Sequence, residues 1–268
     1  MPVIEKAKTL IWFAQRPSYW RHAVALARRK FGEDFDSPAL QAEASQWASE
    51  RTVSVAEALT SLGFLSAGNR PPEIEQGVLL RAHESARQSK VAMGGAGDIG
   101  LLYAATVLSG TRTAIETGVA YGWSSLAILA GLDTREGALL ISVDMPYPKM
   151  DNEAFVGVAV PDELRVGWLL VREPDRRGVE KAIEMAGRSV DLVHYDSDKS
   201  YQGRAYAYPL LWDALRTGGV FISDDIGDNL AFRDFMAHQR VPFAVTCFEG
   251  KHVGIARKHD SSVEFRSK

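Results

Sequence analysis

The sequence predicts an α/β fold in which strands and helices alternate around a mostly parallel sheet. Three observations support this prediction. Residues 113–144 read as a strand, a glycine turn, a helix and a second strand. Short apolar runs then alternate with helical segments over residues 168–238. Finally, the apolar runs at 241–248 and 252–256 flank Glu249-Gly250-Lys251, a turn typical of an antiparallel hairpin.

The unit at 113–144 contains the first candidate site. Its first strand ends in an acid, two glycines follow at a spacing of four, two serines open the helix, and a second acid closes the second strand. Glycines let a ligand approach the backbone, and a helix N-terminus offers unpaired N–H groups. A carboxylate after the second strand commonly binds the ribose hydroxyls of a nucleoside cofactor. The candidate cofactor residues here are Glu116, Gly118, Ala120, Gly122, Ser124, Ser125 and Asp144.

The glycine spacing is not the G-x-G-x-x-G that brings a pyrophosphate onto a helix end, and Glu116 before the turn would repel a pyrophosphate. The E-x-G-x-x-x-G turn with its strand-end acid resembles motifs I and II of the class I S-adenosylmethionine-dependent methyltransferases. The resemblance, which covers about Met93 to Lys258, implies that cofactor. It also implies a Rossmann-like seven-stranded sheet, ordered 3-2-1-4-5-7-6, with strand 7 antiparallel. A structural glycine turn in another α/β protein is the alternative interpretation.

The chain divides into two parts. Residues 1–90 are expected to form a helical N-terminal extension that serves as a lid or in oligomerisation, and residues 91–268 the methyltransferase domain. Basic residues interleave with aromatic ones over 9–31, a pattern that suits docking on the protein itself, on a second copy in a homodimer, or on a membrane surface. Compact helices are expected at 54–65 and 74–90.

The order of elements in the second part follows from periodicity and turn residues. A long loop at 145–165 suggests a lid or binding loop. Strands are expected at 168–171, 190–195 and 220–223, before the two strands of the hairpin. Helices are expected at 99–108 (capped by Asp98), 175–186, 203–215 and 232–238.

Two further segments are candidates for cofactor contact. The glycine-rich loop at 91–98 resembles the cofactor-covering loop of catechol-type O-methyltransferases, which implies contacts from Met93, Gly94 and Gly95. Asp175 falls where that family contacts adenine, and it is equally suited to cap the following helix.

Asp196, Asp224 and Asp225 end two neighbouring strands of the expected sheet, so they should meet at its carboxyl edge. Adjacent carboxylates suit a hard cation such as Mg²⁺. The alternative is that the pair at 224–225 caps the next helix and that no metal binds.

The pattern Asp196-x-x-Lys199 looks like that of metal-dependent catechol O-methyltransferases, and the surrounding Asp-Ser-Asp-Lys-Ser-Tyr is similar to macrocin-type natural-product O-methyltransferases. The resemblance implies that Asp196 binds both metal and cofactor and acts in catalysis, and that Lys199 is the general base. That role requires the pKa of Lys199 to be depressed by the metal and by burial. An ordinary solvated lysine is the competing interpretation, and His194 is expected to be a packed strand residue.

Composition limits the remaining possibilities. The net charge of −3 gives no general attraction to nucleic acid. Cys247 is the single cysteine, which fits a reducing compartment, and it is expected to be buried. The chain shows neither a signal peptide nor a spanning segment, so a cytoplasmic location is expected.

The sequence thus predicts a Mg²⁺-dependent O-methyltransferase for a small hydroxylated acceptor such as a catechol, a sugar diol or a natural product. A metal-independent methyltransferase, an NAD-type oxidoreductase and a membrane-associated non-enzymatic protein are the alternatives.

Overall fold

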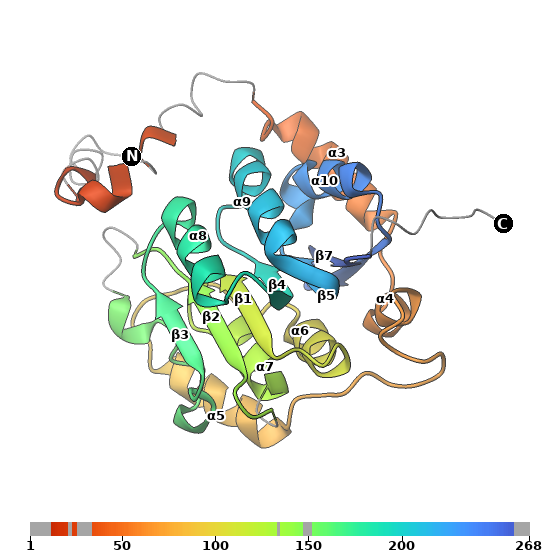
Figure 1. Cartoon of the computed structure of the whole chain (residues 1–268), viewed down its shortest axis with the longest axis horizontal. Coiled ribbons are helices and arrows are strands. Elements are labelled where there is room, and N and C mark those ends of the chain that lie inside the picture. Colours follow the sequence, from red (N-terminus) through yellow and green to blue (C-terminus); the bar gives the residue numbers. More distant parts are fainter. Residues whose placement is uncertain (1–11, 21–22, 26–33, 133–134, 147–151, 260–268) are drawn as a thin grey trace.

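The computed structural model describes residues 12–20, 23–25, 34–132, 135–146 and 152–259. A seven-stranded sheet runs through the molecule in the order β3-β2-β1-β4-β5-β7-β6 (Figure 1). Strands β1 to β5 are parallel, and β7 is antiparallel to both β5 and β6. The predicted strand order and the antiparallel seventh strand are confirmed.

The strands lie close to their predicted bounds. They are β1 (Thr113–Thr117), β2 (Leu139–Val143), β3 (Trp168–Val171), β4 (Val190–Tyr195), β5 (Leu215–Ser223), β6 (Phe243–Phe248) and β7 (Lys251–Arg257). The predicted hairpin turn joins β6 to β7, with positive φ at Glu249 and Gly250. Strand β5 begins earlier than predicted because the chain passes directly from helix α9 into extended backbone at Leu215.

Helices cover both faces of the sheet. They are α3 (Pro38–Ser49), α4 (Val55–Ser61), α5 (Gln76–Arg87), α6 (Ile99–Leu108), α7 (Trp123–Leu132), α8 (Asp175–Met185), α9 (Tyr201–Ala214) and α10 (Ala231–Gln239). Short 3-10 turns occur at η1 (Pro17–Tyr19), η3 (Glu153–Phe155), η4 (Asp162–Leu164) and η5 (Ile226–Asp228). In Figure 1, α8, α9 and α10 lie on one side of the sheet, and α5, α6 and α7 on the other.

Alternation along the strands separates two hydrophobic cores. In β1, Ala114 packs under α6 and α7, whereas Ile115 faces the α8–α9 side. The same parity holds in β4, where Leu192 belongs to the first core and Val193 to the second. Because the strands are in register, equivalent positions of neighbouring strands share a face. A polar residue near a strand end therefore has a predictable neighbour across the sheet.

The N-terminal helices pack directly on this core. Ala48 of α3 is buried in the α8–α10 core, and Leu59 of α4 in the α6–α7 core. Helix α4 begins with a capping box, in which the Ser54 hydroxyl accepts from Glu57 N–H and the Glu57 carboxylate accepts from Ser54 N–H. The division at residue 90 stays a prediction, and most of the basic stretch at 9–31 lies outside the described residues.

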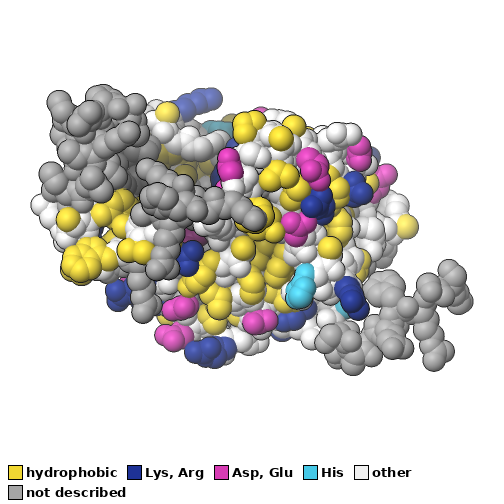
Figure 2. Space-filling view, turned by 90° about the horizontal axis from the view of Figure 1, so that it is seen from above, with side chains coloured by type: hydrophobic (Ala, Val, Ile, Leu, Met, Phe, Trp, Pro, Cys, Tyr) yellow, Lys and Arg dark blue, Asp and Glu magenta, His cyan; other side chains and the backbone are white. Residues whose placement is uncertain are grey.

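The prediction for Cys247 was wrong. The side chain is exposed because β6 is an edge strand and position 247 lies on its outer side, between buried Thr246 and partly buried Phe248. Within the described residues, every helix is too short or too polar to cross a bilayer. From above, Figure 2 shows hydrophobic side chains in the middle of the face, with basic and acidic residues mixed around them rather than in one basic surface, among the residues drawn in colour.

Candidate active site

A row of buried polar side chains crosses the carboxyl edge of the sheet. Glu116 pairs in register with Ser142 of β2 and with His194 of β4, so all three lie on the face covered by α6 and α7. The Glu116 carboxylate is fully buried and accepts hydrogen bonds from Ser125 Oγ (2.5 Å) and Ser142 Oγ (2.7 Å). Trp168 Nε1 in turn donates to Ser142 Oγ. Predicted residues Glu116 and Ser125 are therefore brought together, as parts of one network.

His194 links this row to the carboxylates at the end of β5. Its Nδ1 lies 3.6 Å from Glu116 Oε1 and its Nε2 3.9 Å from Asp224 Oδ1, and the ring is fully buried. These distances exceed those of hydrogen bonds, so the attraction is mainly Coulombic. Burial lowers the pKa of His194, but Asp224 and Glu116 outweigh burial and raise the pKa to about 10. The imidazole is therefore charged at neutral pH. His194 is packed in the strand as expected from sequence, and it also forms part of a buried charge network.

The two glycines of the turn are needed for contacts within the chain. Gly118 has φ +82°, and a Cβ there would lie 2.3 Å from Asp196 O. Gly122 has φ +86°, and a Cβ there would lie 2.9 Å from Gly157 Cα in the predicted lid. Ala120 also has positive φ, and its carbonyl accepts from Gly157 N–H. These residues thus shape a tight turn that presses against both the end of β4 and the described part of the lid.

Asp144 lies at the predicted place, at the end of β2, and it is 5 % exposed. Its Oδ1 accepts from Val119 N–H at 3.0 Å, which ties it to the glycine turn. Its Oδ2 is paired with Arg172, which also pairs with Glu153 of the lid. Burial raises the pKa of Asp144, and Val119 N–H and Arg172 offset part of that rise. Oδ2 of Asp144 is thus held by the Arg172 side chain, and a ligand hydroxyl could take the place of that arginine.

The N-terminal segment and the lid both reach this corner. Tyr19 OH donates to the Arg172 carbonyl at 3.1 Å. In the lid, residues 147–151 lie outside the described part, and residues 152–165 pack closely on the turn, with Ala159 N–H donating to the Tyr121 carbonyl at 2.8 Å. The described lid is therefore a layer over the glycine turn.

The glycine-rich loop runs past the same turn. Met93 N–H donates to Tyr121 OH at 3.3 Å, while Gly94 and Gly95 are exposed. At the end of the loop, a Cβ on Gly97 would lie 3.3 Å from Asp224 Oδ2. Asp98 caps α6 as predicted, by accepting from Leu101 N–H at 3.0 Å. The loop therefore lies beside the carboxylates that end β5.

Asp175 does not cap helix α8, so that alternative was wrong. Its carboxylate turns back to the end of β4 and accepts from Ser197 Oγ (2.5 Å) and from Tyr195 OH (3.3 Å). Burial raises the pKa of Asp175 to about 6, and the Ser197 hydroxyl opposes that rise. Ser124, at the start of α7, is partly buried, and no role of its side chain emerges.

The structure brings Lys199 to the acids at the ends of β4 and β5. Its Nζ lies 3.1 Å from Asp196 Oδ1 and is paired with Asp225. Asp225 has the left-handed backbone conformation (φ +51°) that turns the chain into η5, and its other oxygen lies 3.6 Å from Lys251 Nζ. Asp196 and Asp225 therefore share one ammonium group, whereas Asp224 faces His194.

The pKa values of this cluster bear on the expected role of Lys199. Burial lowers the pKa of Lys199, but Asp196 and Asp225 outweigh burial and raise it well above its ordinary value. This shift is opposite in direction to the depression that a general base at this position would need, and the role of Lys199 stays a prediction. Burial and then Asp224 raise the pKa of Asp196 to about 6, although Lys199 and His194 oppose the rise.

The predicted magnesium site does not fit this arrangement. Among the described residues, no group of three or more His, Cys, Asp or Glu side chains is disposed to hold a metal ion. The reason lies in the contacts above, since Lys199 stands between Asp196 and Asp225. A divalent cation placed there would meet an ammonium at close range.

A cavity of about 360 Å³ opens next to the cluster, between α3, η5 and the β6–β7 turn. Asp225 belongs both to its wall and to the Lys199 pair, so the cavity adjoins the cluster. Polar and charged side chains predominate among the described residues of the wall, which suits a ligand rich in hydroxyl groups. The lining residues are Pro38, Gln41, Ala42, Ser45, Asp225, Gly227, Asp228, Gly250, Lys251 and His252.

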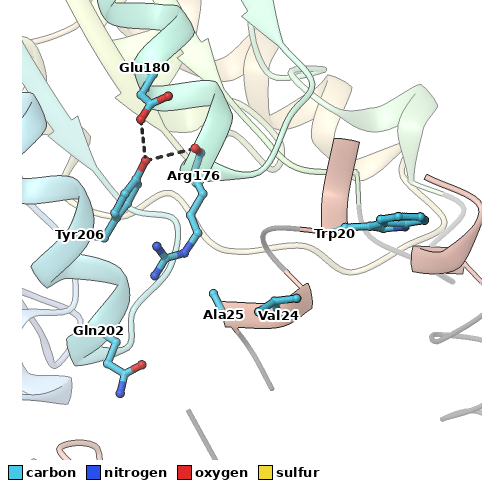
Figure 3. A pocket seen from close by; sticks show the side chains of 7 residues that line it. All are labelled: Trp20, Val24, Ala25, Arg176, Glu180, Gln202 and Tyr206. Atoms are coloured by element: carbon cyan, nitrogen blue, oxygen red, sulfur yellow. Dashed lines mark hydrogen bonds between the residues drawn. The ribbon is translucent and has the colours of Figure 1, made fainter. Parts of the chain in front are cut away.

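A second cavity, of about 550 Å³, lies between the N-terminal segment and helices α8 and α9 (Figure 3). Tyr206 OH donates within it to the Arg176 carbonyl and to Glu180, as Figure 3 shows, while Trp20 and Val24 form its far side. It shares no lining residue with the cluster of Asp196, Lys199 and Asp225.

Residues 115–226, which contain the glycine turn, the strand-end acids and the Lys199 cluster, match the family model of the methyltransferase domain. This part of the chain therefore resembles a methyltransferase domain. No curated protein sequence matches the chain.

Solved structures share the fold of this chain at low sequence identity. An O-methyltransferase from Bacillus cereus, in complex with SAH, is 14% identical, with a TM-score of 0.53 over 79% of this chain and 100% of that one. A Klebsiella pneumoniae protein assigned as an O-methyltransferase is 15% identical, with a TM-score of 0.56 over 80% and 100%. A Staphylococcus aureus protein assigned as a caffeoyl-CoA O-methyltransferase is 9% identical, with a TM-score of 0.52 over 68% and 93%.

Sequence reasoning missed two residues in the candidate active-site region of this chain. His194 could have been found from the parallel register, because positions equivalent to Glu116 on neighbouring strands become its neighbours. Arg172 gave no such signal, since a loop arginine that reaches Asp144 is recognised only once the β3–α8 turn is placed.

Proposed function

We propose that this protein is a class I methyltransferase that transfers the methyl group of S-adenosylmethionine to a hydroxyl group of a small molecule. The observation that carries the proposal is the position of Asp144 beside the turn at Gly118, with one oxygen bound to Val119 N–H and the other held by Arg172. A ribose diol can take the place of Arg172 at that oxygen. The fold shared with an O-methyltransferase structure that contains SAH supports the same cofactor.

The remaining predicted cofactor residues would line the rest of the cofactor site. The turn at 118–122 and the loop at 93–97 approach each other through the Tyr121 hydroxyl and Met93 N–H. The cofactor's methionine tail would lie between them, and its adenine would lie on the side of Arg172 and Asp175. Fully buried Glu116 would act from beneath, by holding the start of α7 through Ser125.

Methyl transfer needs only an aligned nucleophile, because the sulfonium already activates the methyl group. When bound, the cofactor would supply a methyl group whose carbon–sulfur bond breaks as the acceptor oxygen bonds to the methyl carbon. The electron pair of the broken bond would stay on sulfur, which gives S-adenosylhomocysteine. The hydroxyl proton passes to the Asp196 carboxylate, whose pKa of about 6 leaves it ionised and moderately basic at neutral pH. The Lys199 ammonium would stabilise the developing negative charge on the acceptor oxygen.

The acceptor would occupy the cavity beside Asp225. Its polar wall favours a hydroxyl-rich molecule, such as a sugar of a natural product, over a bare catechol. The expected homodimer, membrane-surface contact and cytoplasmic location stay predictions. A dehydrogenase is disfavoured because residues 115–226 match a methyltransferase domain.

Magnesium is not part of this proposal, because the three acids do not fit the ion as they stand. Turnover with and without a chelator measures whether an ion is nonetheless required.

Calorimetric titration with S-adenosylmethionine tests the cofactor assignment. Asp144→Ala should weaken binding at least about tenfold, since it removes a charge-assisted ribose contact and the carboxylate that fixes the turn. Asp162→Asn is the matched control, because that lid carboxylate is fully exposed. No binding to the parent protein, or an equal effect of both variants, would contradict the assignment. Mass spectrometry of glycosides and catechols incubated with the cofactor then tests the acceptor class.

A further inference from the structure

The cation in the carboxylate cluster is part of the protein. Lys199 Nζ lies between Asp196, at 3.1 Å, and Asp225, with which it is directly paired. Lys251 approaches the other oxygen of Asp225 at 3.6 Å, from the cavity side. Two acids from neighbouring strand ends are thus joined by one ammonium group, and a second lies just beyond it.

The backbone on both sides of Lys199 is fixed, so its position is built into the fold. Ser200 caps α9 by accepting from Gly203 N–H. The Lys199 carbonyl accepts from Asn229 Nδ2 at 2.8 Å.

The acids at the end of β5 are fixed as well. The fully buried Arg204 donates to the carbonyls of Asp224 and Asp225 at 2.9 and 2.8 Å, and to Asn229 Oδ1. The same arginine and asparagine therefore hold both the loop that carries the lysine and the turn that carries the acids.

From this geometry we propose that the Lys199 ammonium is the resident cation of the cluster, in the position that a divalent metal ion would otherwise take. Methyl transfer then proceeds without a divalent metal. The second statement rests on the proposed function, whereas the first concerns metal binding and is independent of it.

Charge supports this assignment. Asp196 and Asp225 are paired with Lys199 and Lys251, and Asp224 faces the charged His194, so each of the three acids already has a cationic partner. A divalent ion would add two further positive charges. At about 3 Å, repulsion between the ion and the ammonium would oppose binding unless the lysine left its pocket. Removing the lysine should instead leave two acids able to bind a metal ion.

Titration of the apo protein with Mn²⁺, followed by electron paramagnetic resonance, tests the first statement. Any Mn²⁺ signal of the parent protein should be independent of Asp196, so it should be the same in Asp196→Asn. Lys199→Met should bind Mn²⁺ at least roughly tenfold more tightly than the parent, because a repelling charge is gone. Adding Asp196→Asn to Lys199→Met should abolish the gain. Lys251→Met is the matched control, which removes the same charge but keeps Lys199 in place, and it should show no such gain.

Two results would overturn the inference. One is Mn²⁺ binding by the parent protein that depends on Asp196, and the other is an equal affinity of the parent and Lys199→Met. Lys199→Gln gives a second test if Lys199→Met does not fold. For the second statement, turnover of the parent protein should be unchanged by EDTA, and a loss that Mg²⁺ restores would refute it. Failure to bind S-adenosylmethionine would refute the proposed function and leave the Mn²⁺ result standing.

Discussion

Replacing His194 by glutamine should destabilise the protein strongly. With an effective dielectric constant of about 20, attraction between the imidazolium and each carboxylate is roughly 4–5 kcal/mol at 3.6 and 3.9 Å. Desolvation of the buried cation opposes a large part of that sum. Removing one partner of a buried ion pair typically costs about 3–5 kcal/mol, and we expect a loss in that range at pH 7.

Urea unfolding followed by circular dichroism measures this loss, and thermal unfolding should show a decrease in Tm of about 6–20 °C. His252→Gln is the matched control, because that partly exposed histidine lies 3.1 Å from the Ser49 hydroxyl and has no carboxylate contact of this kind. The control should lose no more than about 1 kcal/mol. A loss at His194 as small as that of the control would refute the reasoning.

The same variant has a pH signature. Because Glu116 and Asp224 raise the pKa of His194 to about 10, its stabilisation is fully present below about pH 6.5 and is lost as the pH rises through 10. The difference in unfolding free energy between the parent and His194→Gln should therefore shrink between pH 6.5 and 10. A constant difference over that range would show that His194 is neutral in the folded protein.

Three further predictions follow from the site. In urea unfolding, Gly118→Ala should lower stability by more than Gly137→Ala. Both glycines have positive φ, but only at Gly118 would a Cβ meet a backbone oxygen, at 2.3 Å. Equal losses in the two variants would contradict this. Turnover should fall as the pH drops through about 6, because protonated Asp196 cannot accept the acceptor's proton, and a pH–rate profile flat from 5 to 8 would remove that role. Asp98→Ala should cost about 1 kcal/mol, measured by urea unfolding, through loss of the α6 cap at Leu101 N–H, and an unchanged midpoint would refute it.

Much of the fold could be predicted because local patterns repeat at the period of each element. The β-branched and leucine runs of β2, β3 and β4 are bounded by polar or turn residues, so their limits were found directly. The acids that end β2 and β4 were recognised because the carboxyl edge of a parallel sheet collects such residues. The prediction that Cys247 is buried failed because a hydrophobic run does not reveal which strand lies at the edge of the sheet.

The sequence predicted which residues form the candidate site, but not which of their side chains are charged. Asp196, Lys199 and Asp225 do meet, as adjacent strand ends require. Whether Lys199 gains or loses affinity for its proton depends on distances of a few ångströms to each acid, and no spacing in the sequence encodes those distances.

The sequence by itself determined the glycine turn and the acids at the sheet edge, because these depend on periodicity and on residue types at fixed offsets. The strand order came from the family resemblance that those residues carry. Only the tertiary structure decided that His194 lies between Glu116 and Asp224, that Arg172 pairs with Asp144, and that an ammonium stands among the acids. These are contacts between side chains remote in sequence, and their energies are set by burial and distance, which exist only once the chain is folded.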